Sequence, residues 1–199
     1  AKANLTNKNY FKDVNDYIIK YEKHNVRGDD YNVYHRLPSS IKITENQWDV
    51  LTLKKINMNS STLISREDCP QKYRNKYIDE HSGYLHSEIL RSLTLEDAFH
   101  WIEKYYNKGE RREYAHEIVE YLETKDMVEI LKKYGNFIKE IKRPKVSECE
   151  SAINCDPFNI RYIKNPSDKM VIKALTLNKD VEKYITKTEK VCKFLGEKL

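Results

Sequence analysis

The spacing of hydrophobic and polar positions predicts helices along the whole chain. In the first part, hydrophobic side chains recur at steps of three and four residues, which is the spacing of one face of an α-helix. The first predicted helix spans Tyr10–His24 and turns Val14, Tyr17 and Ile18 inward. No segment shows the strict alternation of a half-buried β-strand. The pattern therefore predicts an all-α protein.

Capping residues mark where several of these helices begin. A Ser or Thr followed three residues later by Asp or Gln resembles the capping box that satisfies free N–H groups at a helix start. The predicted starts are Thr44 with Gln47, Ser65 with Asp68, and Thr94 with Asp97. Gly109 occupies the position that favours glycine after a helix C-terminus. These signals predict an irregular helical N-terminal region over residues 1–124.

A repeat of 22 residues begins after this region. Ile141-Lys142-Arg143-Pro144 returns as Ile163-Lys164-Asn165-Pro166 and again as Ile185-Thr186-Lys187-Thr188. Three further columns keep their residue type from copy to copy. These columns are Leu131, Ile153 and Leu175; Ile130, Ala152 and Ala174; and Lys139, Arg161 and Lys183. A fixed period of this kind is typical of stacked helical repeats.

Each copy predicts a longer helix, a short break and a short second helix. The longer helices are predicted at Met127–Lys133, Ser147–Asn154 and Asp168–Leu177. The breaks fall at Gly135, at Asp156-Pro157 and at Asn178, where Asp and Asn can cap the next helix. The side chains predicted to point inward from the second helices are Ile141, Ile163 and Ile185, with Phe137, Ile160 and Val181 beside them. Thr188–Leu199 is predicted to be a terminal helix that covers the end of the array.

The charge of the chain is concentrated in this repeat region. Residues 1–124 carry 19 Lys and Arg against 20 Asp and Glu, whereas residues 125–199 carry 17 against 11. The repeat region can therefore attract an anionic partner. The four cysteines have neither the spacing of a zinc site nor a disulfide framework, and they predict reduced thiols in a cytoplasmic protein. No run of about 18 apolar residues is present, so no membrane span is expected.

The candidate binding residues lie on the second helices and just after them. Lys139, Arg161 and Lys183 form a basic column, with Lys142 and Lys164 one turn later. In stacked helix pairs, equivalent residues lie about 8–10 Å apart, so these side chains can meet successive phosphates or an acidic protein surface. Tyr162 and Tyr184 can add stacking surfaces. The alternative interpretation is that these cations are only the solvated face of the helices.

Catalytic and metal sites find little support. There is no nucleophile elbow, no phosphate-binding glycine-rich loop, no dinucleotide motif and no carboxylate cluster at metal-ligand spacing. No cofactor and no metal are expected. His81, His86 and His35 leave open a small nuclease or transferase that uses loop histidines as general base and acid. Histidines at helix ends or on the surface are the alternative interpretation.

The second copy carries a resemblance to a known class of repeat. Its features are Ala152-Ile153, the Asp156-Pro157-Phe158 break and the ending Tyr162-Ile163-Lys164-Asn165-Pro166. They resemble short tandem helical repeats found in proteins of large DNA phages and giant viruses. The third copy departs from that ending, with Thr188 in place of the proline. Those repeats have no settled activity, so the resemblance implies a viral origin and an architecture rather than a mechanism.

Three functional hypotheses follow from the sequence. The leading one is a non-enzymatic viral accessory or inhibitor protein that binds a host protein or protein–nucleic-acid complex through the repeat surface in the host cytoplasm. The second is direct binding of nucleic acid by the basic column. The third is the histidine enzyme. Stacked helix pairs in residues 125–199 underlie the first two.

Overall fold

The chain folds into helices throughout the part that the structure describes. The computed structural model describes residues 13–19, 37, 40–53, 61–81, 83–85 and 87–197. The described residues contain no strand, and the all-α prediction is confirmed. The chain divides into two compact units, Ala1–Leu93 and Thr94–Leu199. Helices that precede the predicted division between residues 124 and 125 thus share a unit with the repeat region.

In the first unit, short helices pack around large apolar side chains. The helices are α2 (Glu45–Leu53), α3 (Ser61–Ile64), α4 (Gln71–Glu80) and α5 (Ser87–Arg91). Residues 14–19 are also helical, and Val14, Tyr17 and Ile18 are buried as predicted. The other residues of the predicted Tyr10–His24 helix, except Asp13, lie outside the described part of the chain.

The capping prediction holds at one of the two sites in the first unit. The Thr44 backbone N–H donates to Gln47 Oε1 at 3.0 Å, and the Gln47 N–H donates to Thr44 Oγ1 at 3.4 Å, so the predicted box is confirmed. Ser65 with Asp68 does not start a helix, because residues 65–69 form turns and α4 begins only after Pro70. The Asp68 carboxylate is instead bound by Arg66, with Nε–Oδ1 at 2.8 Å.

In the second unit, α6 (Leu95–Lys104) and α7 (Ala115–Tyr121) precede the repeats. Thr94 and Asp97 form the predicted capping box of α6. A short 3₁₀-helix, η3 (Tyr106–Lys108), follows α6 and ends at Gly109, whose φ of 85° is left-handed as the C-terminal signal requires. A second one, η4 (Arg112–Tyr114), leads into α7.

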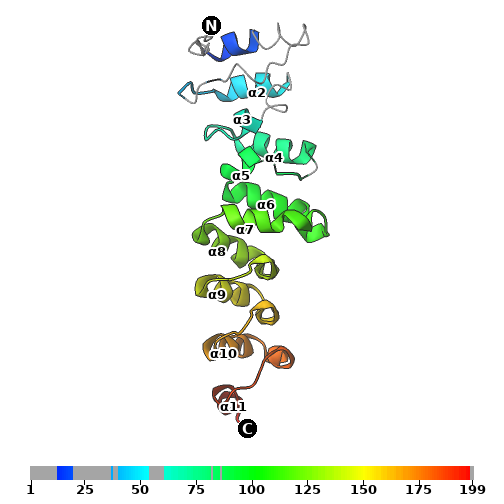
Figure 1. The fold of residues 1–199 in the computed structure, drawn as a ribbon, viewed down its shortest axis with the longest axis vertical. Coiled ribbons are helices and arrows are strands. Elements are labelled where there is room, and N and C mark those ends of the chain that lie inside the picture. Colours follow the sequence, from blue (N-terminus) through cyan, green and yellow to red (C-terminus); the bar gives the residue numbers. More distant parts are fainter. Residues whose placement is uncertain are drawn as a thin grey trace, which may run out of the picture. The chain divides into compact units, whose positions relative to one another are not determined.

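The repeat region consists of three α-helices that each lead into a 3₁₀-helix. The α-helices are α8 (Thr124–Lys133), α9 (Val146–Cys155) and α10 (Asp168–Leu177), and the 3₁₀-helices are η5 (Gly135–Glu140), η6 (Pro157–Tyr162) and η7 (Lys179–Tyr184). Both sets begin at 22-residue intervals. Figure 1 shows the α-helices stacked in one column with the 3₁₀-helices beside them, and α9 contacts α8 and α10 while η6 contacts η5 and η7. We call each pair a tier.

The second member of each tier is a 3₁₀-helix because its bonds join residues three apart. The Phe137 N–H donates to the Tyr134 carbonyl at 2.9 Å, and the Asn159 N–H donates to the Asp156 carbonyl at 2.9 Å. Asp156 Oδ1 accepts from the Phe158 N–H, and Asn178 Oδ1 accepts from the Asp180 N–H, as the capping prediction required. Each of these six-residue segments is short enough to keep the tighter 3₁₀ hydrogen-bond pattern throughout.

The apolar columns of the repeat form the interior of this unit. Leu131, Ile153 and Leu175 are buried, as are Ile130, Ala152 and Ala174. Phe137, Ile160 and Val181 are buried as predicted. Of the three isoleucines after the 3₁₀-helices, Ile163 is buried, whereas Ile141 and Ile185 are only partly buried. The terminal helix α11 (Glu189–Leu195) contacts α10 and buries Val191 and Cys192.

Candidate binding surface

The predicted basic column occupies one equivalent position in the three tiers. Lys139, Arg161 and Lys183 are each the fifth residue of a 3₁₀-helix, and each is exposed. The 22-residue period places them there because the 3₁₀-helices themselves begin at that interval. We call these three residues, together with Lys142, Lys164, Tyr162 and Tyr184, the basic face.

Each cation of the column lies over a tyrosine ring. Lys139 Nζ is 5.3 Å from the centroid of the Tyr106 ring, and Lys183 Nζ is 5.1 Å from that of Tyr184. The Arg161 guanidinium lies 4.8 Å from the Tyr162 ring and 5.6 Å from the Tyr184 ring, so it joins the second and third tiers. Exposed contacts of this kind stabilise by about 0.5–1 kcal/mol each.

The two tyrosines of the basic face are already partly engaged. Tyr162 is 36% exposed and Tyr184 is 41% exposed. The Tyr184 ring has two cations over it and the edge of Phe158 against it, with centroids 5.9 Å apart. A nucleic-acid base that stacked on Tyr184 would have to compete with these neighbours. Tyr162, Tyr184, Arg161 and Lys183 all remain exposed to solvent in the structure.

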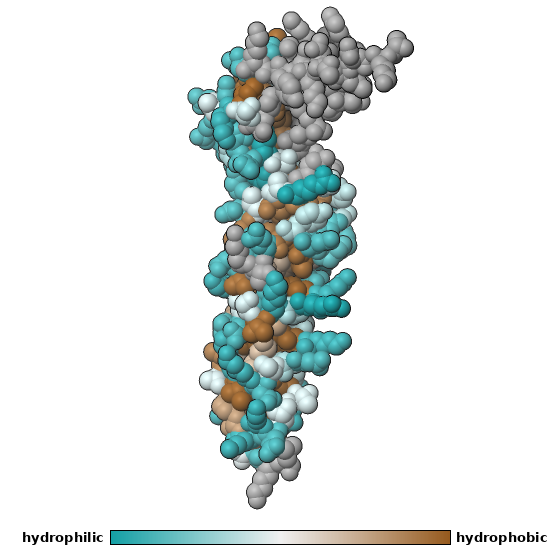
Figure 2. Space-filling view, turned by 60° about the vertical axis from the view of Figure 1, so that its left-hand side comes forward, coloured by the Kyte–Doolittle hydropathy of each residue, from teal (hydrophilic) through white to brown (hydrophobic). Residues whose placement is uncertain are grey.

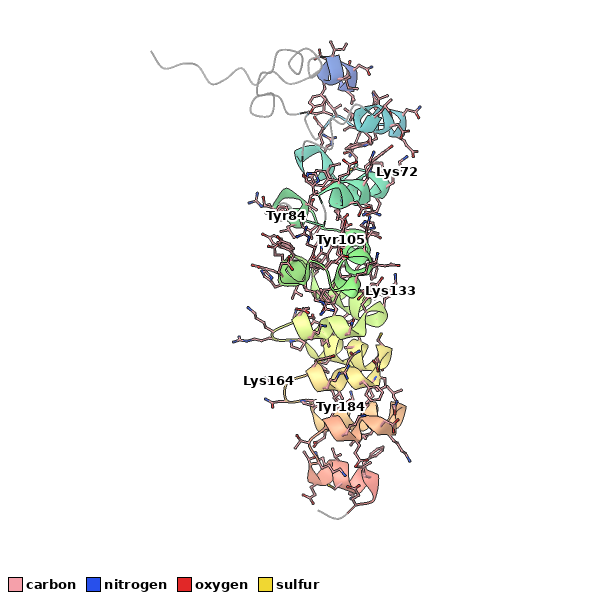
Figure 3. The ribbon with its side chains drawn as sticks, turned by 90° about the vertical axis from the view of Figure 1, so that its right-hand side faces the viewer. Lys72, Tyr84, Tyr105, Lys133, Lys164 and Tyr184 are labelled. Carbon is pink, nitrogen blue, oxygen red and sulfur yellow. The ribbon has the colours of Figure 1, made fainter. Side chains whose placement is uncertain are left out.

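Lys142 and Lys164 occupy the loops that follow η5 and η6. Both are exposed, and no carboxylate within the described part of the chain pairs with either. In Figure 3, Lys164 extends from one edge of the second unit, while Lys133 extends from α8 at the opposite edge. Figure 2 shows long hydrophilic side chains protruding along one edge of this unit. Because Lys142 and Lys164 have no carboxylate partner among the described residues, they are available to an anionic partner.

The loops that carry Lys142 and Lys164, with parts of α9 and α10, line an open groove of about 460 Å³. Arg143, Val146 and Lys169 line it as well, and the sequence did not single out these three as binding residues. Two features of the sequence could have identified these residues. Arg143 belongs to the repeated tetrad, and Val146 is apolar where the other copies have Thr124 and Asp168. We call this feature the inter-loop groove.

The positive charge decreases in the third tier. Thr186 replaces the lysine of the earlier loops, and Lys187 pairs with Glu182 at 2.5 Å and with Glu197 at 2.8 Å. Glu182 lies next to Lys183 in η7. The field of Lys183 is therefore partly cancelled by this carboxylate, whereas Lys142 and Lys164 of the first two loops have no carboxylate partner among the described residues.

Lys133, on α8, is engaged in intramolecular contacts. Lys133 Nζ lies 3.3 Å from Glu103 Oε2 and 4.9 Å from the Tyr134 ring centroid. Hydrogen bonds with Tyr134 and Glu103 raise the pKa of Lys133. Tyr106 Oη donates to Glu140 Oε1 at 2.5 Å. Burial is the main cause that raises the pKa of the Tyr106 phenol, and the Glu140 carboxylate raises it further. The lysines in the loops of the basic face have no such partners in the described structure.

Of the three histidines that the enzyme hypothesis names, the structure describes only His81. His81 Nδ1 lies 2.9 Å from the Tyr77 carbonyl, and the His81 and Tyr77 rings stack with centroids 4.0 Å apart. His81 is thus part of the C-terminal end of α4. His86 and His35 lie outside the described residues. Over the described ranges, no group of three His, Cys, Asp or Glu side chains is arranged around a metal position.

Within the described residues, no helix has the length and apolar character needed to cross a membrane. Comparisons with known protein families, with curated proteins and with solved structures found no match for this chain. The functional argument therefore depends on the geometry of the basic face and the inter-loop groove.

Proposed function

We propose that this protein is a non-catalytic binding protein whose C-terminal tiers bind an acidic macromolecular partner through the basic face and the adjoining Arg143. The observation that carries the proposal is the set of exposed cations in the first two loops. Lys142, Arg143 and Lys164 have no carboxylate partner within the described part of the chain, unlike Lys133 and Lys187. Cations left unpaired on one edge steer and orient an anionic partner more than they stabilise the fold.

The repeat resemblance supports a viral setting for this function. If the chain comes from a phage or giant virus, its partner is a component of the infected host, and the protein acts in the host cytoplasm as an accessory or inhibitor. A host protein, or a protein bound to nucleic acid, supplies the acidic surface. The tiers offer a continuous row of equivalent positions to such a partner, as in other stacked repeats.

Direct nucleic-acid binding is the second candidate, and the column Lys139, Arg161 and Lys183 favours it. Evenly placed cations can contact successive phosphates and release counterions, which makes the affinity fall steeply with salt. The cations over Tyr184 work against base stacking, because its ring is already engaged. This candidate therefore predicts binding with little sequence preference.

Affinity capture from host lysate tests the proposal, with and without nuclease. The test variant is Lys142→Gln/Arg143→Gln/Lys164→Gln. The matched control is Lys132→Gln/Lys173→Gln/Lys193→Gln, which removes the same charge from α8, α10 and α11. We expect the test variant to lose about tenfold or more of the captured partner, and the control to retain it. Equal capture by both variants would disprove the proposal, and capture abolished by nuclease would favour the second candidate.

A further inference from the structure

The inter-loop groove combines a charged rim with apolar lining. Lys142 and Arg143 come from the loop after η5, and Lys164 comes from the equivalent loop after η6. Val146, at the start of α9, contributes exposed apolar surface, whereas Met170, in the first turn of α10, also lines the groove but is buried. The volume of about 460 Å³ is within the range of sites that hold small ligands or a few side chains.

The apolar lining includes one large side chain that is exposed. Val146 is 64% exposed at the first position of α9. The equivalent positions of the neighbouring copies hold Thr124 and Asp168, which suit a solvated helix start. Covering an exposed valine side chain with an apolar group is favourable, so Val146 is a ready contact for an apolar group.

The rim is strongly positive. Four cations line the groove, which are Lys142, Arg143, Lys164 and Lys169. The one carboxylate in the lining is Glu150, which lies 3.4 Å from Lys169 Nζ. Because Glu150 compensates only Lys169, the other three cations face the opening without a partner among the described residues. Ser167, the N-terminal cap of α10, also lines the groove, and the helix start adds positive partial charge.

We infer that the inter-loop groove binds a short peptide segment of the partner in which one apolar side chain is flanked by Asp or Glu. The apolar side chain contacts the exposed Val146, and the flanking carboxylates pair with Lys142, Arg143 and Lys164. This inference rests on the proposed function and specifies which chemistry of the partner the face recognises.

The apolar lining distinguishes a peptide from nucleic acid in this groove. Phosphates and sugars would satisfy the cations, but they would leave the exposed Val146 without an apolar contact. Bases would need an aromatic platform, and the groove lining contains no aromatic side chain. A peptide supplies both charge and apolar surface within a few residues. Charge complementarity and the exposed valine thus favour the same occupant.

Fluorescence anisotropy with the full chain tests the inference at low and moderate salt. The probes are labelled synthetic peptides in which one leucine, valine or phenylalanine is flanked on each side by two acidic residues. Matched peptides carry serine at the apolar position, and single-stranded oligothymidylate of equal charge serves as the nucleic-acid probe. We expect the acidic–apolar peptides to bind about tenfold more tightly than the serine peptides, with affinity that weakens as salt rises.

Two variants locate the contacts. Val146→Ser should reduce affinity for the acidic–apolar peptides to that of the serine peptides, since the exposed side chain can be changed without disturbing the core. Lys142→Gln/Arg143→Gln/Lys164→Gln should abolish binding of both, whereas Lys132→Gln/Lys173→Gln/Lys193→Gln should bind like the wild type. Circular dichroism confirms that each variant is folded.

Several outcomes would overturn the inference. These are no binding by any acidic–apolar peptide, equal binding of the serine peptides, or tighter binding of oligothymidylate. The proposed function fails separately, if lysate capture does not depend on the loop cations. Charge-dependent capture without peptide binding would therefore reject the groove and keep the proposed function.

Discussion

Gly135 and Asn159 lie closer together than any side chain on residue 135 would permit. A Cβ built on Gly135 would stand 2.4 Å from Asn159 Nδ2, 2.9 Å from Cys155 Cβ and 3.0 Å from the Ala152 carbonyl oxygen. The Asn159 amide donates to that same carbonyl at 3.0 Å. The start of η5 therefore packs directly on the next tier, and the first two tiers are joined through this contact.

Gly135→Ala should destabilise the second unit by about 1–3 kcal/mol, because the added methyl meets backbone as well as side chains. Denaturant unfolding followed by circular dichroism measures the loss. Asn136→Ala, at the exposed neighbouring position, is the control and should change stability by less than about 0.5 kcal/mol. Adding Asn159→Ala to Gly135→Ala should not restore full stability, since Ala152 and Cys155 remain in contact. Wild-type stability in Gly135→Ala would contradict this packing.

Arg74 supports the first unit from within. It is 3% exposed and donates to the Ile64 carbonyl at 2.7 Å and to the Ser92 carbonyl at 2.9 Å. Arg74→Met leaves these acceptors without their charged donor, and we expect a loss of about 2–4 kcal/mol. Thermal unfolding provides the measurement. Lys76→Met on the same helix should be nearly neutral, because its 3.9 Å pair with Glu80 is exposed.

Acid should weaken the first unit through Asp68. Burial raises the pKa of this carboxyl, but the hydrogen bonds from Arg66 and from the Ile43 N–H outweigh burial and hold the pKa below its ordinary value. A depressed pKa contributes stability that is present above about pH 4 and is lost as the pH falls through the folded-state pKa. The free energy of unfolding should therefore fall more steeply in this acidic range for the wild type than for Asp68→Asn.

The reference for this pH experiment is Glu67→Gln, which alters an exposed neighbour. It should retain the acid dependence of the wild type. At neutral pH, Asp68→Asn should already be less stable by about 1–3 kcal/mol, because the Arg66 ion pair is weakened. Parallel pH profiles for the wild type and Asp68→Asn would exclude the assigned role.

The cysteines should differ in reactivity. Cys155 is exposed, whereas Cys69, Cys149 and Cys192 are buried. Burial raises the pKa of the Cys149 thiol and the nearby Glu148 raises it further, which disfavours the reactive thiolate. Maleimide labelling of the native protein, read by mass spectrometry, should modify Cys155 first. Cys155→Ser should abolish this rapid phase, and rapid labelling of Cys149 would contradict its burial.

The sequence predicted most of the local structure of the tiers. Apolar spacing placed Asp168–Leu177 at the bounds observed for α10 and the other two α-helices within three residues at each end. The Thr94–Asp97 box and the caps at Asp156 and Asn178 were also predictable. These features depend on residues that are three or four positions apart, so the local sequence carries the information. The binding roles of Lys139, Arg161 and Lys183 stay predictions.

Tertiary structure decided what local spacing does not encode. Residues 65–69 form turns because Arg66 binds Asp68 and also donates to the Ile41 carbonyl at 2.5 Å, a contact 25 residues away. The inter-loop groove exists because two loops one period apart lie side by side, which brings Val146 and Lys164 together. The apolar period determined which helices form, whereas packing between tiers determined which charges remain unpaired, because only distant segments supply or withhold their partners.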